Sequence, residues 1–386
     1  MPNARRTHTF TESVIREMTR VAQQYGAINL AQGFPDFPMP EAMKHAAYDA
    51  IGRDLNQYAI TWGAKKLRDA IAGKYARRYG MPVDPEREIT VCCGATEAMA
   101  SVVLALINPG DEVLIFEPFY ENYGPDAILC EAHPVFVPLT PPDWHFDART
   151  LEQAITARTR AIILNSPHNP TGHVFSRDEL ATIAQLAIAH DLLVLTDDPY
   201  EYIVFAGAHT PIATLPGMRD RTVTISSLSK TFSITGWRIG YAIAPEEQTS
   251  AIRKVHDFLT VGAPAPLQDA AAIGYGFDEA YYAKLSADYQ ARRDYLGAAL
   301  REAGFRFANP DGAYYFLTDF TDLSDEDDVT FAKWMAREIR VATVPGSSFF
   351  RPGAAEGRRY VRFAFCKRHE TLEQAVTRLA RLRARV

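Results

Sequence analysis

The sequence predicts an α/β protein in which a mostly parallel sheet of seven strands lies between layers of helices. Short apolar runs rich in β-branched residues alternate along the chain with segments of helical periodicity, as in parallel sheets covered on both faces. The chain has 386 residues, of which 47% are hydrophobic. It is therefore long enough to bury a large core and to form more than one domain.

The seven expected strands are each too short and too β-branched to be helices. They are residues 89–92, 112–116, 134–137, 161–164, 192–195, 222–225 and 238–244. Between them, residues 96–107 and 177–190 carry apolar side chains at helical spacing. Asn108-Pro109-Gly110 is expected to end the first of these helices.

The pattern changes after about residue 281. A long helix is expected over 282–303 and strands over 313–317 and 360–365, while the acidic stretch 319–328 predicts an exposed loop. We therefore expect three parts. They are an N-terminal segment, 1–44, that joins the small domain, a large domain, 45–280, and a small α+β domain, 281–386.

The composition excludes several classes of protein. The net charge is −6 and basic residues are not clustered, so nucleic acid is not an expected partner. No apolar run approaches membrane-spanning length, and residues 1–10 lack the apolar core of a secretory signal. Neither a disulfide framework nor metal-ligand spacing is found among Cys92, Cys93, Cys130 and Cys366. We expect a cytoplasmic protein with buried thiols at 92 and 93, no metal and no membrane contact.

The segment 226–240 is the most informative for function. Lys230 stands there among hydroxyl side chains, eight residues before Arg238. A positioned amine can hold an aldehyde cofactor as a Schiff base, and a phosphate on that cofactor needs fixed donors, which Ser227 and Arg238 could supply. Taken alone, the segment also fits a surface turn with a solvated lysine.

Polar residues follow other expected strands, where ligands bind in open α/β sheets. Gly94-Ala95-Thr96 comes after strand 89–92 and starts a helix whose free N–H groups suit a phosphate, although a turn capped by Thr96 would look the same. After strand 161–164, two prolines and a glycine fix the backbone around Asn169. Asn169 could donate to a ring oxygen, or the segment could be a plain Pro-Gly turn.

A carboxylate and a phenol follow the strand 192–195. Asp197 ends this apolar run and Tyr200 comes three residues later. A buried carboxylate needs a cationic partner, and a protonated pyridine nitrogen would supply one. Tyr200 could reach an oxygen on the same ring. Aspartates at strand ends also serve as metal ligands or helix caps, so the pattern alone leaves these readings open.

In this order along the chain, these elements resemble the fold-type I pyridoxal-phosphate enzymes, and within them the class I aminotransferases. The similarity extends from residues 29–37 to residues 360–365. It implies pyridoxal 5'-phosphate bound to Lys230 in the large domain, with Asp197 on the pyridine nitrogen and Asn169 and Tyr200 on the ring oxygen. The phosphate would be bound by Gly94, Ala95, Thr96, Ser227 and Arg238, and Tyr120 would stack on the ring, with Phe119 as the alternative. Arg362 would bind the substrate α-carboxylate, and Gly33 and Asn169 would lie beside the substrate.

The resemblance also implies partners and a reaction. Tyr58 would reach the phosphate of the neighbouring subunit, so a homodimer with shared active sites is expected. The reaction would be ping-pong transamination between an L-amino acid and a 2-oxo acid, with Lys230 moving the α-proton. Residues 32–37 are most similar to the kynurenine, glutamine and methionine aminotransferases, which implies a neutral or aromatic donor, although Arg16 and Arg20 could serve a second carboxylate.

Two departures and two alternatives accompany this resemblance. Pro199 constrains the backbone before Tyr200, and His168 stands where relatives commonly have asparagine. A lyase acting by β- or γ-elimination would share the scaffold and the lysine. A non-enzymatic regulator would usually carry an added DNA-binding module, whereas the expected fold begins within the first 30 residues.

Overall fold

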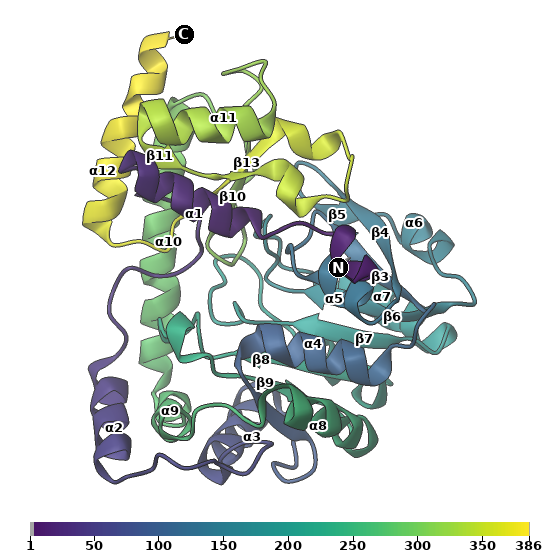
Figure 1. The fold of residues 1–386 in the computed structure, drawn as a ribbon. Helices are drawn as coiled ribbons and strands as arrows, with labels where there is room; N and C mark the ends of the chain where they lie inside the picture. Colours follow the sequence, from purple (N-terminus) through teal and green to yellow (C-terminus); the bar gives the residue numbers. More distant parts are fainter. Residues whose placement is uncertain (1–3, 386) are drawn as a thin grey trace.

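The central sheet has eight strands in the computed structural model, which describes residues 4–385 (Figure 1). In order across the sheet they are β2 (Ile89–Cys92), β9 (Gly240–Ile243), β8 (Thr222–Ser227), β7 (Leu193–Asp197), β6 (Thr159–Asn165), β3 (Glu112–Glu117), β4 (His133–Thr140) and β5 (His145–Phe146). The five strands from β8 to β4 are mutually parallel, whereas β9 runs antiparallel to both its neighbours. The predicted α/β class with a mostly parallel sheet is confirmed.

All seven expected strands are present, and two details differ. The strand expected from Arg238 begins only at Gly240, because Arg238 adopts a left-handed backbone with φ 54° and ends a 3-10 turn over Thr235–Trp237. The eighth strand, β5, pairs antiparallel with β4 through only two residues. Two residues are too few to leave a periodic pattern in the sequence.

Helices cover both faces of the sheet because its strands are apolar on both sides. In β3, Leu114 and Phe116 belong to one core cluster, while Val113 and Ile115 belong to another. The first cluster includes residues of α6 (Ala148–Gln153) and α7 (Arg177–Ala189), and the second includes residues of α4 (Gly94–Leu106), α5 (Tyr123–Leu129) and α8 (Glu246–Thr260). A third cluster packs α2 (Glu41–Gly52), α3 (Lys65–Tyr79) and α9 (Ala265–Ala271) beside β2 and β9.

The parallel strands bring their carboxyl ends to one edge of the sheet. Asn165, the last residue of β6, lies in register with Asp197, the last residue of β7. Asp197 in turn lies opposite Ile225, two residues before β8 ends at Ser227. Residues that follow these strands therefore meet in space although they are far apart in the sequence.

The C-terminal residues form a second, smaller layer above the central sheet in Figure 1. Its strands are β10 (Tyr315–Asp319), β13 (Tyr360–Ala364) and β12 (Val344–Pro345), beside a two-stranded pair of β1 (Ile28–Asn29) and β11 (Val341–Ala342). Its helices are α1 (Val14–Tyr25), α10 (Glu279–Glu302), α11 (Asp328–Trp334) and α12 (His369–Leu379). The N-terminal residues thus pair with the C-terminal part of the chain, since Ile28 lies in register with Val341. The boundaries after residues 44 and 280 stay a prediction.

The acidic stretch 319–328 is a largely exposed loop in its middle, over residues 321–327, as its charge predicts, but it is buried at its ends. Asp319 ends β10 with 8% exposure and forms ion pairs with Arg359 and Arg306. Asp328 begins α11 with 2% exposure and accepts a 2.7 Å hydrogen bond from the Ser347 amide. The loop prediction was therefore wrong at both ends, because partners distant in sequence allow these carboxylates to be buried.

The four cysteines are free; Cys92, Cys130 and Cys366 are buried and Cys93 is partly exposed. In the described residues 4–385, no helix combines the length and apolarity needed to cross a lipid bilayer.

Candidate active site

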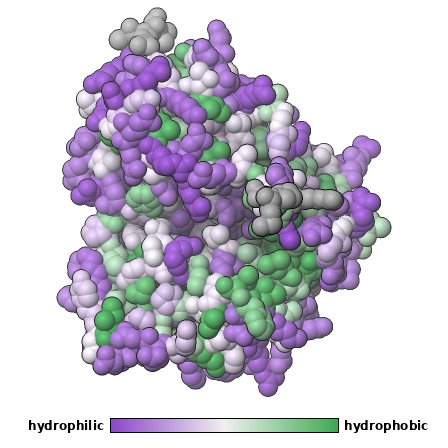
Figure 2. Space-filling view, viewed as in Figure 1, coloured by the Kyte–Doolittle hydropathy of each residue, from purple (hydrophilic) through white to green (hydrophobic). Residues whose placement is uncertain are grey.

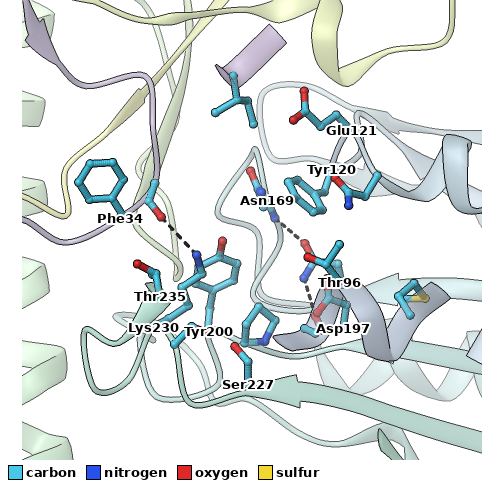
Figure 3. A pocket seen from close by; sticks show the side chains of 18 of the residues that line it. Phe34, Thr96, Tyr120, Glu121, Asn169, Asp197, Tyr200, Ser227, Lys230 and Thr235 are labelled. Atoms are coloured by element: carbon cyan, nitrogen blue, oxygen red, sulfur yellow. Dashed lines mark hydrogen bonds between the residues drawn. The ribbon is translucent and has the colours of Figure 1, made fainter. Parts of the chain in front are cut away.

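A cavity of about 410 Å³ lies where the central sheet ends, between the large sheet and the C-terminal layer (Figure 3). Its walls combine the loops after β2, β3, β6, β7 and β8 with segments from both ends of the chain. The predicted site residues that line it are Gly33, Ala95, Thr96, Tyr120, Asn169, Asp197, Tyr200, Ser227, Lys230, Arg238 and Arg362. Gly94 and Tyr58 do not line it.

The amine of Lys230 lies inside this cavity. Its Nζ donates a 3.2 Å hydrogen bond to the carbonyl of Gly33 and lies 6.0 Å from the ring centre of Tyr200. Burial lowers the pKa of the Lys230 ammonium to about 8, and the charge of Arg238 acts in the same direction. A substantial fraction of this amine is therefore neutral near physiological pH and able to attack a carbonyl.

The carboxylate of Asp197 faces the same space and is only half satisfied. Its Oδ2 accepts a 2.7 Å hydrogen bond from the Tyr123 hydroxyl, whereas its buried Oδ1 has no partner within the described part of the chain. Burial raises the pKa of the Asp197 carboxyl to about 6, against the opposing effects of the Tyr123 hydrogen bond and the Lys230 charge. An acceptor left in this state suits a protonated ring nitrogen.

A chain of hydrogen bonds joins this carboxylate's backbone to Arg362 on β13. Asn165 Nδ2 donates to the carbonyl of Asp197 at 2.5 Å, and Asn165 Oδ1 accepts from the amide of Asn169 at 2.7 Å. Arg362 then donates from Nη1 to Asn169 Oδ1 at 2.7 Å and from Nη2 to the Ala31 carbonyl at 2.9 Å. The Arg362 side chain is 1% exposed, and its Nε has no partner among the described residues. This buried cation suits a carboxylate ligand.

The turn after β2 approaches Arg238 closely. Gly94 has φ 84°, and a Cβ on it would lie 2.2 Å from Arg238 Nη2, so only glycine fits there. Arg238 donates from Nη1 to the Thr235 carbonyl at 3.0 Å. Ala95 and Thr96 start α4 and line the cavity beside Ser227. Helix amides, hydroxyls and a guanidinium thus converge, as a phosphate site requires.

Two tyrosines form the wall opposite this turn. The hydroxyl oxygens of Tyr200 and Tyr315 lie 3.0 Å apart, and burial raises the pKa of both phenols. Tyr200 therefore stays protonated and can donate to a ring oxygen. Tyr315 lies against Gly33, where a Cβ would come within 2.0 Å of its hydroxyl. Pro199 lines the cavity and does not turn Tyr200 away from it.

The structure distinguishes the two candidates for a stacking aromatic. Tyr120 lines the cavity, whereas Phe119 is 6% exposed and stacks on Phe136 at 5.0 Å. This geometry favours Tyr120. His168 is buried below the loop with its Nδ1 2.7 Å from Thr171 Oγ1, and burial lowers its pKa to about 3. It therefore acts as a neutral packing residue.

The start of α1 forms the outer wall. Ser13 and Arg16 line the cavity, and Ser13 Oγ donates to Glu121 Oε1 after β3. This contact holds the N-terminal segment over the opening. Arg20, the other expected cation, faces outward, where it pairs with Glu12 at 2.9 Å and does not line the cavity.

Several residues that line the cavity were not predicted from the sequence, among them Tyr123, Asn165 and Tyr315. Asn165 ends β6, so the rule that ligands bind beyond strand ends could have identified it. Tyr123 follows Tyr120 by three residues, a spacing that puts both on one side of a helical turn. No sequence signal marks Tyr315.

Comparisons with known proteins agree with this geometry. A family model described as aminotransferase class I and II matches residues 25–379. A protein of Mycobacterium tuberculosis named as a probable N-succinyldiaminopimelate aminotransferase is 43% identical over 98% of each chain, and the methionine aminotransferase of Escherichia coli is 36% identical over 96% of each. Kynurenine–oxoglutarate transaminase 3 of Rattus norvegicus is 36% identical over 97% of this chain and 88% of its own.

Solved structures give the same result. The N-succinyldiaminopimelate aminotransferase of Mycobacterium tuberculosis superposes with a TM-score of 0.96 at 43% identity, covering 99% of this chain and 100% of its own. An Escherichia coli protein described as having a methionine aminotransferase function superposes with a TM-score of 0.94 at 35% identity, covering 99% of each chain.

Proposed function

Because this chain belongs to the class I and II aminotransferases, whose members use pyridoxal 5'-phosphate, we propose that it moves the amino group of a large neutral or aromatic L-amino acid to a 2-oxo acid in a ping-pong reaction. The observation that carries the proposal is the convergence of Lys230, Asp197 and Arg362 in one cavity. The three supply an amine, an anion and a carboxylate clamp.

The described residues fit this cofactor. The unpartnered Asp197 Oδ1 would accept from the pyridine nitrogen, Tyr200 and Asn169 would hold the ring oxygen, and Tyr120 would cover the ring face. The phosphate would lie among Ala95 and Thr96 of the turn after β2 and their neighbours Ser227 and Arg238. Gly94 leaves room for the Arg238 guanidinium. When bound, the cofactor supplies an electrophilic carbonyl carbon and a ring that accepts electrons from the substrate.

Each step then depends on a residue of this chain. Lys230 would take the proton from the substrate α-carbon and return it to the carbon that comes from the cofactor's carbonyl group, two atoms away, which requires its amine to be neutral, as the lowered pKa allows. Asp197 would hold the positive charge of the ring nitrogen. The Tyr200 phenol would donate a hydrogen bond to the ring oxygen and so stabilise the negative charge that develops there.

Arg362 would orient the substrate by its α-carboxylate. Its guanidinium is fixed by Asn169 and by the Ala31 carbonyl, so only part of its donor fork remains for a ligand. A carboxylate bound there would place its α-carbon inside the cavity that Lys230 also lines. The substrate side chain would then point toward the wall made by Tyr120, Ser13 and α1.

A second class of donor is favoured by Arg16. This arginine is exposed at the rim of the cavity on α1, where a long side chain ending in a carboxylate could reach it. N-succinyldiaminopimelate, the substrate in the name of the Mycobacterium tuberculosis relatives, has such an end. The elimination alternative is not favoured, since the matched relatives are named as aminotransferases or transaminases.

A donor and acceptor screen tests the proposal. The enzyme would be incubated with glutamine, methionine, kynurenine or N-succinyldiaminopimelate and with several 2-oxo acids, and the new amino acid would be measured beside ammonia. We expect a new amino acid with the neutral or aromatic donors. If only the succinylated donor reacts and Arg16→Ala removes that activity, the second class replaces the first. Ammonia without a new amino acid would overturn the aminotransferase assignment.

We also propose a homodimer in which Tyr58 completes the partner's site. Tyr58 is 86% exposed and does not line the cavity of its own chain. Other large hydrophobic side chains are exposed on α2, α4 and α8, and Figure 2 shows hydrophobic surface over α4. They include Tyr48 (69%), Leu104 (41%) and Phe258 (91%). Hydrophobic surface of this kind supports contact with a second copy.

A further inference from the structure

Two histidines and a glutamate meet outside the active site. His145 lies on β5, His173 follows the loop that carries Asn169, and Glu179 lies in the first turn of α7. Both β5 and α7 lie in the right half of Figure 1, beside the edge of the sheet. None of the three residues lines the active-site cavity. Their separation in sequence forms no motif, so only the fold reveals them.

The distances among these side chains match a metal site. His145 Nδ1 lies 2.9 Å from Glu179 Oε1, and His173 Nε2 lies 3.1 Å from the same oxygen. One ligand atom from each residue lies within 4.8 Å of the others. Zinc bonded at its usual lengths in a tetrahedron holds its ligand atoms about 3.3 Å apart. The two histidine–glutamate distances therefore differ by about 0.2–0.4 Å from those of such a site, and the two histidine ligand atoms lie within 4.8 Å of each other.

Two of the three ligands are held in place by neighbours outside the cluster. Glu179 Oε2 accepts hydrogen bonds from the amide and the hydroxyl of Ser176, both at 2.8 Å, and lies 3.2 Å from His173 Nε2, while Oε1 contacts both histidines. The ring of His173 is 3% exposed and packs edge-on against Phe175 at 4.8 Å. A carboxylate oriented by further hydrogen bonds and a ring fixed by packing are typical of metal ligands.

The surroundings add negative charge and leave one side open. Asp311 lies near both imidazoles; burial raises the pKa of its carboxyl, and the charges of His173, Arg293 and His145 oppose this rise. The His145 side chain is 59% exposed, so solvent reaches the cluster from that side. Three protein ligands with one open position are the arrangement that divalent zinc accepts.

We propose that His145, His173 and Glu179 form a binding site for a divalent transition-metal ion of the zinc class, with solvent in the remaining position. The ion would join β5, α7 and the loop that ends at His173. That loop also carries Asn169 of the active site. The amide of His168, the residue before Asn169, donates a 2.8 Å hydrogen bond to the carbonyl of His173, so the two ends of the loop are joined. We therefore expect the ion to stabilise the fold around this loop and to take no part in the transfer chemistry.

Zinc and cobalt binding to the holoenzyme test the proposal. Chelator-treated, pyridoxal-phosphate-loaded protein would be titrated with zinc chloride against a chromophoric chelator, and with cobalt chloride while the visible absorption is recorded. We expect one ion per chain, a higher melting temperature with zinc, and cobalt bands typical of a low coordination number. Failure to bind one equivalent of zinc at micromolar concentration would overturn the proposal.

Three variants locate the ion. His145→Ala removes an exposed ligand, and Glu179→Gln weakens another while glutamine keeps the helix cap. Each is expected to weaken zinc binding at least about tenfold and to remove the cobalt bands. His133→Ala changes another exposed histidine, outside the cluster, and is expected to bind zinc as the unchanged protein does. Equal zinc affinity in His145→Ala would place the ion elsewhere and refute the assignment.

Discussion

Tyr123 donates a 2.7 Å hydrogen bond to one oxygen of the Asp197 carboxylate, while the other oxygen is buried without a partner among the described residues. The single hydrogen bond does not compensate for burial, so the pKa of this carboxyl is raised to about 6. The Asp197 carboxylate of the apoenzyme is therefore incompletely stabilised, and a cationic ring nitrogen would supply the missing hydrogen bond and the opposite charge.

Asp197→Asn should stabilise the apoenzyme while it impairs catalysis. The folded protein raises the Asp197 pKa from 3.8, so the stability that this residue contributes is complete below that pH and is lost as the pH rises through about 6. At pH 7 the lost contribution is about 3 kcal/mol. The unpaired amide of the asparagine costs about 1 kcal/mol, so the variant should gain about 2 kcal/mol of unfolding free energy. Denaturant unfolding of the apoenzymes at pH 7 and pH 4 measures the difference.

The gain in unfolding free energy should be present at pH 7 and nearly absent at pH 4. The loaded variant should also turn over at least about a hundred times more slowly, because the ring loses its anionic partner. A variant that is no more stable than the unchanged apoenzyme at pH 7 would show that Asp197 is well solvated.

Uptake of pyridoxal phosphate by the apoenzyme should depend on the charge of Lys230. With a pKa of about 8, the neutral fraction of this amine rises about tenfold between pH 7 and pH 9. Stopped-flow absorbance should show the same rise in the association rate constant. Asp197→Asn should move the midpoint to lower pH, because the Asp197 charge raises the Lys230 pKa. A midpoint near pH 10 would mean that the amine is exposed to water.

Arg362→Ala should damage amino acid binding far more than cofactor binding. The guanidinium makes two hydrogen bonds within the protein and would add a charged pair with the substrate. Losing charge-assisted bonds of about 1.5–3 kcal/mol each should lower kcat/KM at least about a hundredfold. The pyridoxal phosphate dissociation constant should change less than about threefold. Comparable losses of both would assign Arg362 a structural role, and Arg362→Lys tests whether a charge without the planar fork suffices.

Tyr58→Phe should weaken cofactor binding although Tyr58 lies outside the cavity of its own chain. In a dimer with shared sites, the lost hydroxyl would remove one hydrogen bond to the partner's phosphate, which corresponds to about a tenfold weaker affinity. Equilibrium dialysis measures the affinity and light scattering measures the dimer. Tyr48→Phe, which changes another exposed tyrosine, is the matched control. An unchanged affinity in Tyr58→Phe would contradict the shared site.

Most of the predicted residues that line this cavity could be identified from the sequence by one geometric rule. Parallel strands end at a common edge, so residues after strands 89–92, 161–164, 192–195 and 222–225 had to lie together. The resemblance added Arg362, which joins Asn169 across 193 positions of sequence. Their chemical roles stay predictions until they are measured.

What the sequence could not predict depends on contacts between distant segments. Three such contacts join segments that no sequence periodicity connects. They are the Tyr200–Tyr315 pair, the hydrogen bond between Ser13 and Glu121, and the cluster of His145, His173 and Glu179. The two ends of the acidic stretch 319–328 were predicted wrongly for the same reason, since Arg359 and the Ser347 amide allow the burial of charges that a local pattern assigns to solvent.

The central claim is that the amine of Lys230 binds the cofactor covalently, and borohydride reduction of the pyridoxal-phosphate-loaded protein tests it most directly. Peptide mass spectrometry of the reduced protein should find the pyridoxyl group on Lys230 alone. Lys230→Ala should give no labelled peptide and no visible absorption, whereas Lys284→Ala, which changes an exposed surface lysine, should be labelled fully. A pyridoxyl group on any other lysine of the unchanged protein, or on none, would contradict the account.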